Sequence, residues 1–263
     1  MFDTASPTSS LRSVVLARAE GGGDPTPALH PGETVLTLGS GAGTLCFRAS
    51  QVVGPMGWVI GIEPDDGLLA IARRHARAVA RRLGYANVEF RKASPCDLRL
   101  DREWLDRLLR EQPIGAEADL VRLEASIAAS CRVLPLVSDE SVDAVVSSCV
   151  PPLVEPEDME RLAREIFRVL RPDGRALVTE LSRNETLVGP DHVDVAHRDE
   201  LFRLRLAEAG FHEIAVLDPP EPSRRGLPGI EPRTVTVTAY KHRRRVRQCG
   251  ATASGAAIGA EGR

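Results

Sequence analysis

Residues 34–43 read Thr-Val-Leu-Thr-Leu-Gly-Ser-Gly-Ala-Gly, a short β-rich run that enters three glycines at alternate positions. An apolar-periodic stretch follows at once, from Leu45 to Val53. This order predicts a strand, a glycine turn and a helix. Such a turn lets the backbone approach a ligand closely and directs the amide groups of the helix N-terminus toward it.

The alternation of strand and helix continues along the chain. A second strand is expected at 58–62, a helix at 66–83 and a third strand at 87–90. This βαβαβ order favours a doubly wound parallel sheet. Further strands are expected at 142–147, 175–180, 214–217 and 234–240, the last two as an antiparallel pair, with a turn at 172–174 and helices at 156–170 and 199–209.

Residues 99–136 interrupt this rhythm with a leucine-spaced, charged segment that predicts two helices separated near Pro113. An insertion of this length before the fourth strand is either a cap over the substrate or a decoration at the sheet edge. Residues 1–30 are rich in Ser, Thr, Gly and Pro and predict a flexible leader. One domain is therefore expected at 31–242, followed by a disordered basic tail at 243–263.

The chain has 263 residues, with 37 acidic and 34 basic side chains and a net charge of −3. Five of the basic residues lie within 241–247, and without them the body has 29 basic residues against 37 acidic. This acidic body does not fit a nucleic-acid partner and favours a small-molecule substrate. No apolar run is long enough to span a membrane, and the start resembles no signal peptide, so a cytoplasmic monomer or homodimer is expected.

Five cysteines occur without CxxC spacing, which argues against a disulfide framework or a structural zinc site. We therefore expect free thiols and no metal. The cysteines are Cys46, Cys96, Cys131, Cys149 and Cys249.

An acidic residue, Glu63, closes the second predicted strand 20 residues after Gly43. An acid at this place can accept hydrogen bonds from both hydroxyls of a ribose. A dinucleotide fingerprint would place its third glycine one residue later than Gly43. S-adenosylmethionine has no pyrophosphate to bind, so it fits this turn better than NAD does.

Five stretches, 35–43, 61–63, 87–90, 141–150 and 165–174, together resemble the class I, seven-stranded Rossmann-like S-adenosylmethionine-dependent methyltransferases. Within this class they are similar to the arsenite methyltransferase branch. The resemblance covers about residues 31–240. It implies a mostly parallel seven-stranded α/β sheet with an antiparallel C-terminal strand.

The resemblance also implies site residues. The three glycines would hold the methionine end of the cofactor, Glu63 the ribose and Asp97 the adenine, while the serines at the end of the fourth strand would lie near the transferred methyl group. Cys149 matches the thiol that binds trivalent arsenic in that branch. The expected cofactor-binding set is Thr37, Gly39, Ser40, Gly41, Gly43, Glu63, Pro64, Asp97, Ser147 and Ser148.

Three further side chains are candidates for catalysis. His192 and His197 flank an irregular stretch after the fifth strand, and a neutral imidazole is available as a general base near pH 7. Glu180 ends that strand and is expected to point into the crevice. The alternative for all three is an exposed side chain without a role.

The chain departs from the branch at several positions. Thr37 replaces the usual acid, so no charged acceptor faces the ammonium end of the cofactor. Ser148 replaces an asparagine, and cysteines are absent from 1–45 and 150–248. An arsenic site with two thiolates would therefore need Cys46 to converge with Cys149. The plain alternative makes both residues structural thiols.

These observations predict an S-adenosylmethionine-dependent methyltransferase that transfers the methyl group in line to a small-molecule acceptor. Two alternatives stay open. One is an enzyme that cyclises the cofactor and releases methylthioadenosine without methyl transfer. The other is a degenerate protein that keeps the cofactor-binding fold without activity.

Overall fold

The computed structural model describes residues 25–148, 154–183, 195–217 and 232–242. Within them, seven strands form one sheet in the order β3-β2-β1-β4-β5-β7-β6. The pairs from β3 to β5 are parallel, whereas β7 runs antiparallel to both of its neighbours. This topology confirms the predicted mostly parallel sheet with an antiparallel C-terminal strand.

The strands are β1 (Thr34–Leu38), β2 (Trp58–Ile62), β3 (Val88–Arg91), β4 (Val142–Ser148), β5 (Leu170–Arg183), β6 (His212–Leu217) and β7 (Pro232–Tyr240). The α-helices are α2 (Thr44–Val53), α3 (Asp66–Leu83), α4 (Arg102–Glu111), α5 (Glu117–Val133), α6 (Met159–Val169) and α7 (Val195–Ala209). Two short 3₁₀ helices are η1 (Thr26–Ala28) and η3 (Pro156–Asp158).

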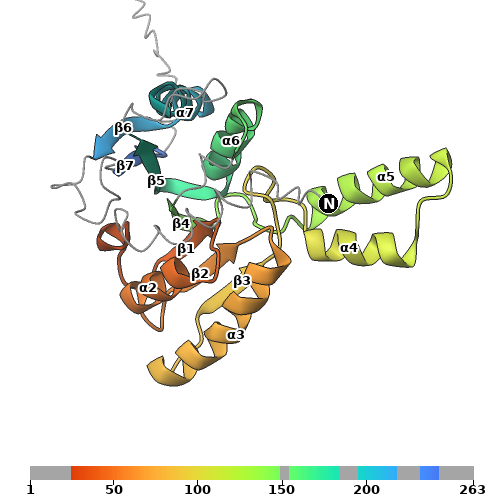
Figure 1. Ribbon diagram of the computed structural model, residues 1–263, viewed down its shortest axis with the longest axis horizontal. Coiled ribbons are helices and arrows are strands. Elements are labelled where there is room, and N and C mark those ends of the chain that lie inside the picture. The colour runs from red at the N-terminus through yellow and green to blue at the C-terminus, as the bar shows by residue number, and fades with distance from the viewer. Residues whose placement is uncertain (1–24, 149–153, 184–194, 218–231, 243–263) are drawn as a thin grey trace, which may run out of the picture.

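Both faces of the sheet are covered, which explains why its strands read as nearly continuous apolar runs. Val35 of β1 packs with Leu69 of α3 in the core beneath α2 and α3. Leu36, on the opposite face of β1, packs with Ile166 of α6 and Phe202 of α7. The two helical layers are visible on either side of the sheet in Figure 1.

Most predicted ends differ from the structure by a few residues, and two predictions differ in more than the ends of an element. The turn expected at 172–174 lies inside β5, where Val142 pairs with Leu170 and Ala144 with Arg175, so the intervening residues form a bulge. Asp173 has a φ of 68° there, which accommodates the excursion without ending the strand. Residues 25–30, predicted as part of the leader, include Leu29, which is buried in the core beneath α2.

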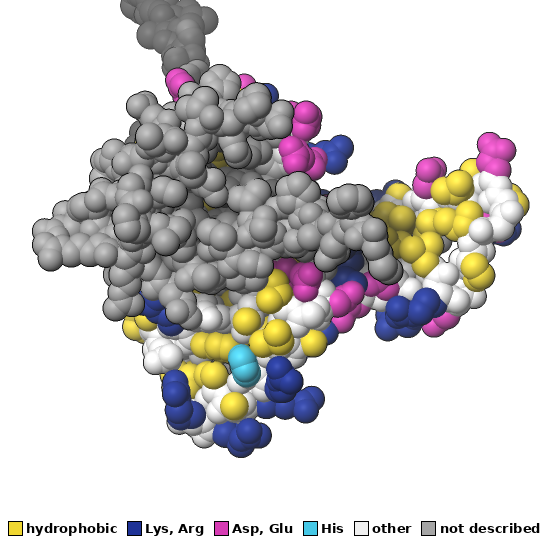
Figure 2. Space-filling view, in the orientation of Figure 1, with side chains coloured by type: hydrophobic (Ala, Val, Ile, Leu, Met, Phe, Trp, Pro, Cys, Tyr) yellow, Lys and Arg dark blue, Asp and Glu magenta, His cyan; other side chains and the backbone are white. Residues whose placement is uncertain are grey.

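The insertion forms a hairpin of α4 and α5 that extends outward past the edge strand β3 (Figure 1). Neither helix contains a fully buried residue, and hydrophobic side chains are visible along its surface in Figure 2. At its root, Lys92 donates to Asp66 and Asp106 over 2.7 and 2.6 Å. The hairpin is thus joined at its root to α3 through Lys92.

The outward side of β3 is occupied by an arginine of α3. Arg73 donates to the carbonyl oxygen of Phe90 through Nη2 and Nε, over 2.7 and 3.3 Å. Its guanidinium is also paired with Glu103 of α4 over 2.7 Å. The hairpin root, α3 and the edge strand are therefore joined by one side chain.

Among the helices of the described ranges, none is long and apolar enough to cross a bilayer.

Candidate functional site

The glycine turn between β1 and α2 depends on left-handed backbone conformations. Gly39, Gly41 and Gly43 have φ values of 63°, 55° and 96°. Side chains other than glycine rarely adopt such values. At Gly43 a Cβ atom would also lie 2.8 Å from both the Phe47 and the Phe90 ring. Glycine is therefore required at position 43, both by the left-handed backbone conformation and by the lack of space for a Cβ atom.

Hydrogen bonds join this turn to the end of β2. The amide of Ser40 donates to the carbonyl of Ile62 over 2.9 Å. The amide of Gly41 donates to Glu63 Oε2, and the amide of Asp65 donates to Oε1 of the same carboxylate, both over 2.9 Å. Glu63 is only 6% exposed. Its two oxygens are thus held in a fixed orientation by backbone groups beside the glycine turn.

Three buried hydroxyls lie at the same edge of the sheet, on Thr37, Ser40 and Ser147. β1 and β4 are adjacent, with Leu38 paired to Ser147, so Ser147 lies on the face of the sheet that Leu38 shares and Thr37 lies on the opposite face. None of the three has a hydrogen-bond partner among the described residues, apart from a weak contact between Thr37 and the Cys46 thiol. A buried hydroxyl without a partner costs roughly 1–3 kcal/mol, so these groups at the carboxyl ends of β1 and β4 indicate a place for a polar ligand.

The other predicted cofactor residues are Asp97, Pro64 and Ser148. Asp97 is exposed, and its Oδ1 accepts the amides of Arg99 and Leu100 over 3.1 and 3.2 Å, so the carboxylate caps its own turn. Pro64 directly follows Glu63 and is half-buried. Ser148 is the last residue of β4, and its side chain lies outside the described part of the chain.

The predicted catalytic residues remain predictions. Cys149 and His192 lie outside the described residues. His197 lies in the first turn of α7 and Glu180 pairs with Val235 in the sheet, but the side chains of both lie outside the described set.

Cys46 of α2 lies within the core beneath α2 and α3 and is fully buried. Burial raises the pKa of its thiol from an ordinary 9.0 to about 12, while the contact with Thr37 acts weakly in the opposite direction. The thiol is therefore protonated at neutral pH, whereas a metalloid ligand must be a thiolate. This environment favours the structural alternative for Cys46 over convergence with Cys149.

The buried thiol predicts a loss of stability at alkaline pH. Because the folded pKa is raised, the unfolded chain loses this proton first, so stability is unaffected below about pH 9 and falls toward pH 12, by up to about 1.4 kcal/mol per pH unit. Urea unfolding between pH 7 and 10.5 measures this slope. Cys46→Ala, which lacks the thiol, should show a shallower decline than the unsubstituted protein. Equal slopes would contradict the assignment.

The sequence analysis did not predict that α6 contacts the loop at the carboxyl end of β3. The carboxylate of Glu165 accepts the amide of Leu98, over 2.8 Å, in the loop that follows β3. Arg168, one helical turn later, is paired with the same carboxylate. The Glu-x-x-Arg spacing predicts the pair within the helix, but it does not indicate the backbone partner 67 residues away.

Comparison with known proteins gives a consistent result. Residues 29–134 match a family model described as a methyltransferase domain. The chain is 33% identical over 191 residues to an arsenite methyltransferase of Aquipseudomonas alcaligenes, which covers 69% of this chain and 45% of that protein. It is 34% identical over 200 residues to an arsenite methyltransferase of Halobacterium salinarum, with 72% and 40% covered. The chain thus spans less than half the length of these relatives.

Solved structures share the fold. An arsenic(III) S-adenosylmethionine methyltransferase from Chlamydomonas reinhardtii superimposes with a TM-score of 0.53 at 23% identity, covering 89% of this chain and 73% of that one. A SAM-dependent methyltransferase from Aquifex aeolicus gives 0.55 at 19% identity, covering 92% and 100%.

Proposed function

Because the chain carries the methyltransferase domain of the seven-stranded, Rossmann-like class, we propose that the protein binds S-adenosylmethionine beside the glycine turn and transfers its methyl group to a small-molecule acceptor. The relatives that cover most of this chain are named arsenite methyltransferases, so the acceptor that we propose is trivalent arsenic.

The observation that supports this proposal is the fit between the site and the cofactor. S-adenosylmethionine has a ribose with two hydroxyls and an amino acid end with charged polar atoms. Glu63 offers a carboxylate of fixed orientation to the two ribose hydroxyls. The buried hydroxyls of Ser40 and Ser147, which have no partner among the described residues, offer hydrogen-bonding groups to the amino acid end. Gly39, Gly41 and Gly43 carry no side chains, which permits close approach of a ligand to the backbone of the turn.

When bound, the cofactor supplies a methyl group on a sulfonium, with a neutral thioether as leaving group. The chain's own residues then act by orientation: Glu63 fixes the ribose, and the hydroxyls of Ser40 and Ser147 fix the amino acid end. Orientation of two reactants alone can contribute roughly 7–11 kcal/mol, so a dedicated base is not required for a soft nucleophile. Thr37 is neutral, so recognition of the ammonium group depends on dipoles and not on a full charge.

Trivalent arsenic binds soft thiolate ligands, as other soft ions do. Cys149 directly follows β4, the strand that ends with the serines of the site. We propose that Cys149 is the protein thiol that contacts arsenic. Cys46 is assigned no role in the acceptor site, because it is buried and its thiol pKa is about 12.

The test is incubation of the purified protein with labelled S-adenosylmethionine, with and without arsenite and a reducing thiol. S-adenosylhomocysteine and methylated arsenic that form only with arsenite are expected. Formation of methylthioadenosine without an acceptor would indicate cyclisation, and absence of binding would indicate a degenerate protein. Either result would overturn the proposal.

Cys149→Ser is expected to lower arsenite methylation at least about 100-fold while leaving binding of S-adenosylhomocysteine unchanged, because a hydroxyl is a poor ligand for a soft ion. Cys131→Ser is the matched control, since Cys131 lies in α5 of the projecting hairpin. Rates are measured at saturating cofactor for both variants. Activity of Cys149→Ser within threefold of the control would remove this thiol from the mechanism.

A further inference from the structure

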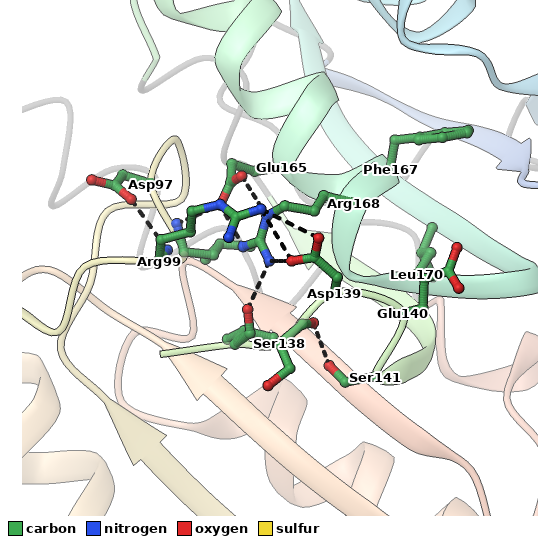
Figure 3. A network of polar contacts seen from close by, with 12 residues as sticks. Asp97, Arg99, Ser138, Asp139, Glu140, Ser141, Glu165, Phe167, Arg168 and Leu170 are labelled. Atoms are coloured by element: carbon green, nitrogen blue, oxygen red, sulfur yellow. Dashed lines mark hydrogen bonds and ion pairs between the residues drawn. The ribbon is translucent and has the colours of Figure 1, made fainter. Parts of the chain in front are cut away.

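A closed ring of hydrogen bonds links the root of the hairpin to α6, and Figure 3 shows its two charged side chains, Glu165 and Arg168, beside Asp139. Leu98 donates its amide to Glu165 Oε2 over 2.8 Å and accepts the amide of Val137 over 2.9 Å. Arg168 donates to both oxygens of Glu165 over 2.7 Å each, and to the carbonyl of Val137 over 2.8 Å. Both polar backbone groups of Leu98 are therefore held by partners that are themselves fixed.

The ion pair in this ring is shielded from solvent. The side chains of Glu165 and Arg168 are only 15% and 11% exposed. Arg168 also pairs with Asp139 over 2.7 Å, and Arg99 reaches the same carboxylate over 3.1 Å. Hydrogen bonds to charged groups with little solvent contact are stronger than those between neutral groups. The ring therefore restrains the backbone at Leu98 and Val137.

The ring supports the loop at 92–98, which follows the end of β3. The amide of Glu63 donates to the carbonyl of Arg91, so the loop leaves β3 next to the ribose carboxylate. Within the loop, the backbone amide of Asp97 donates to the carbonyl of Ser94 over 3.0 Å, a bond between residues close in sequence. Leu98, which is fully buried, is where the loop is fastened to α6.

We infer that Glu165 is a positioning residue for the adenosyl end of the cofactor, acting through the backbone of Leu98. The inference rests on the proposed function, because it presupposes that the cofactor binds beside Glu63. A displacement of about 1 Å in a binding wall can reduce binding and rate substantially. Releasing Leu98 therefore weakens recognition of the adenosyl group without altering the amino acid end.

Glu165→Asp tests this inference. The shorter side chain keeps the negative charge beside Arg168 but no longer reaches the amide of Leu98. The dissociation constants of S-adenosylhomocysteine and methylthioadenosine, measured by calorimetry, are both expected to rise about tenfold and by the same factor. In the proposed reaction, the KM for the cofactor should rise in parallel, while kcat at saturation changes less than about twofold. A purely structural role would lower the folded fraction and leave the dissociation constants unchanged.

Glu160→Gln is the matched control, because Glu160 pairs with Arg164 on the exposed side of α6 and does not contact the loop. Glu165→Gln is a second variant, which keeps an oxygen acceptor for Leu98 and should weaken binding less than Glu165→Asp. If the unsubstituted protein binds neither ligand, the proposed function fails. If it binds both and Glu165→Asp binds as Glu160→Gln does, the positioning role alone is wrong.

Discussion

Glu63→Ala is expected to weaken binding of S-adenosylhomocysteine at least about 100-fold. Two hydrogen bonds from the ribose hydroxyls to a carboxylate contribute roughly 1.5–3 kcal/mol each, and about 2.7 kcal/mol corresponds to a factor of 100. The substitution also removes the acceptor of the Gly41 and Asp65 amides, so the turn keeps only the bond from the Ser40 amide to the Ile62 carbonyl as its described link to β2. Isothermal titration calorimetry measures the change in the dissociation constant.

Asp66→Ala is the control for this prediction, because Asp66 lies three residues away with an exposed carboxylate that pairs with Lys92 at the hairpin root. It should bind the ligand as the unsubstituted protein does. Glu63→Gln keeps one oxygen acceptor and should fall between the two. Binding by Glu63→Ala within threefold of Asp66→Ala would disprove the assignment of this edge of the sheet as the cofactor site.

Gly43→Ala is expected to lower the free energy of unfolding by about 3 kcal/mol. A left-handed conformation costs an L-residue roughly 1–2 kcal/mol, and an added methyl group in a packed region costs roughly 1–3 kcal/mol. The Cβ would meet the edges of Phe47 and Phe90, whose rings already pack against each other with centroids 5.8 Å apart. Urea denaturation monitored by circular dichroism measures the difference.

Gly84→Ala separates the two causes. Gly84 ends α3 with a φ of 80°, but a Cβ there would have no atom within 4 Å. This variant therefore carries the conformational cost alone, roughly 1–2 kcal/mol. Equal destabilisation by Gly43→Ala and Gly84→Ala would show that the contact with the two rings is unimportant.

Local sequence signals predicted most of the sheet because its strands are short and bounded by glycine or charged residues. The bounds of β1, β2 and α3 agree with the prediction. The Pro-Asp-Gly sequence at 172–174 predicted a turn, yet pairing of β5 with β4 absorbs it as a bulge. A local preference was thus overridden by hydrogen bonding with residues about 30 positions away.

The candidate site was predictable where one residue type is required by conformation or charge. The glycines and Glu63 follow from their spacing in the sequence. The lack of partners for Ser40 and Ser147 among the described residues does not, because the hydrogen bonding of a hydroxyl depends on neighbours from other segments. The link between Glu165 and Leu98 likewise joins a side chain to a backbone amide, which leaves no signature in residue types.

The arginine that joins α3, the hairpin root and β3 has a bearing on solubility. An outermost strand with unoccupied carbonyl groups is a template on which extended segments of other molecules can assemble. Arg73 fills the Phe90 carbonyl with two donors and is itself held by Glu103. An incoming segment must therefore break an ion pair before it can extend the sheet there, so this margin of the molecule resists intermolecular aggregation.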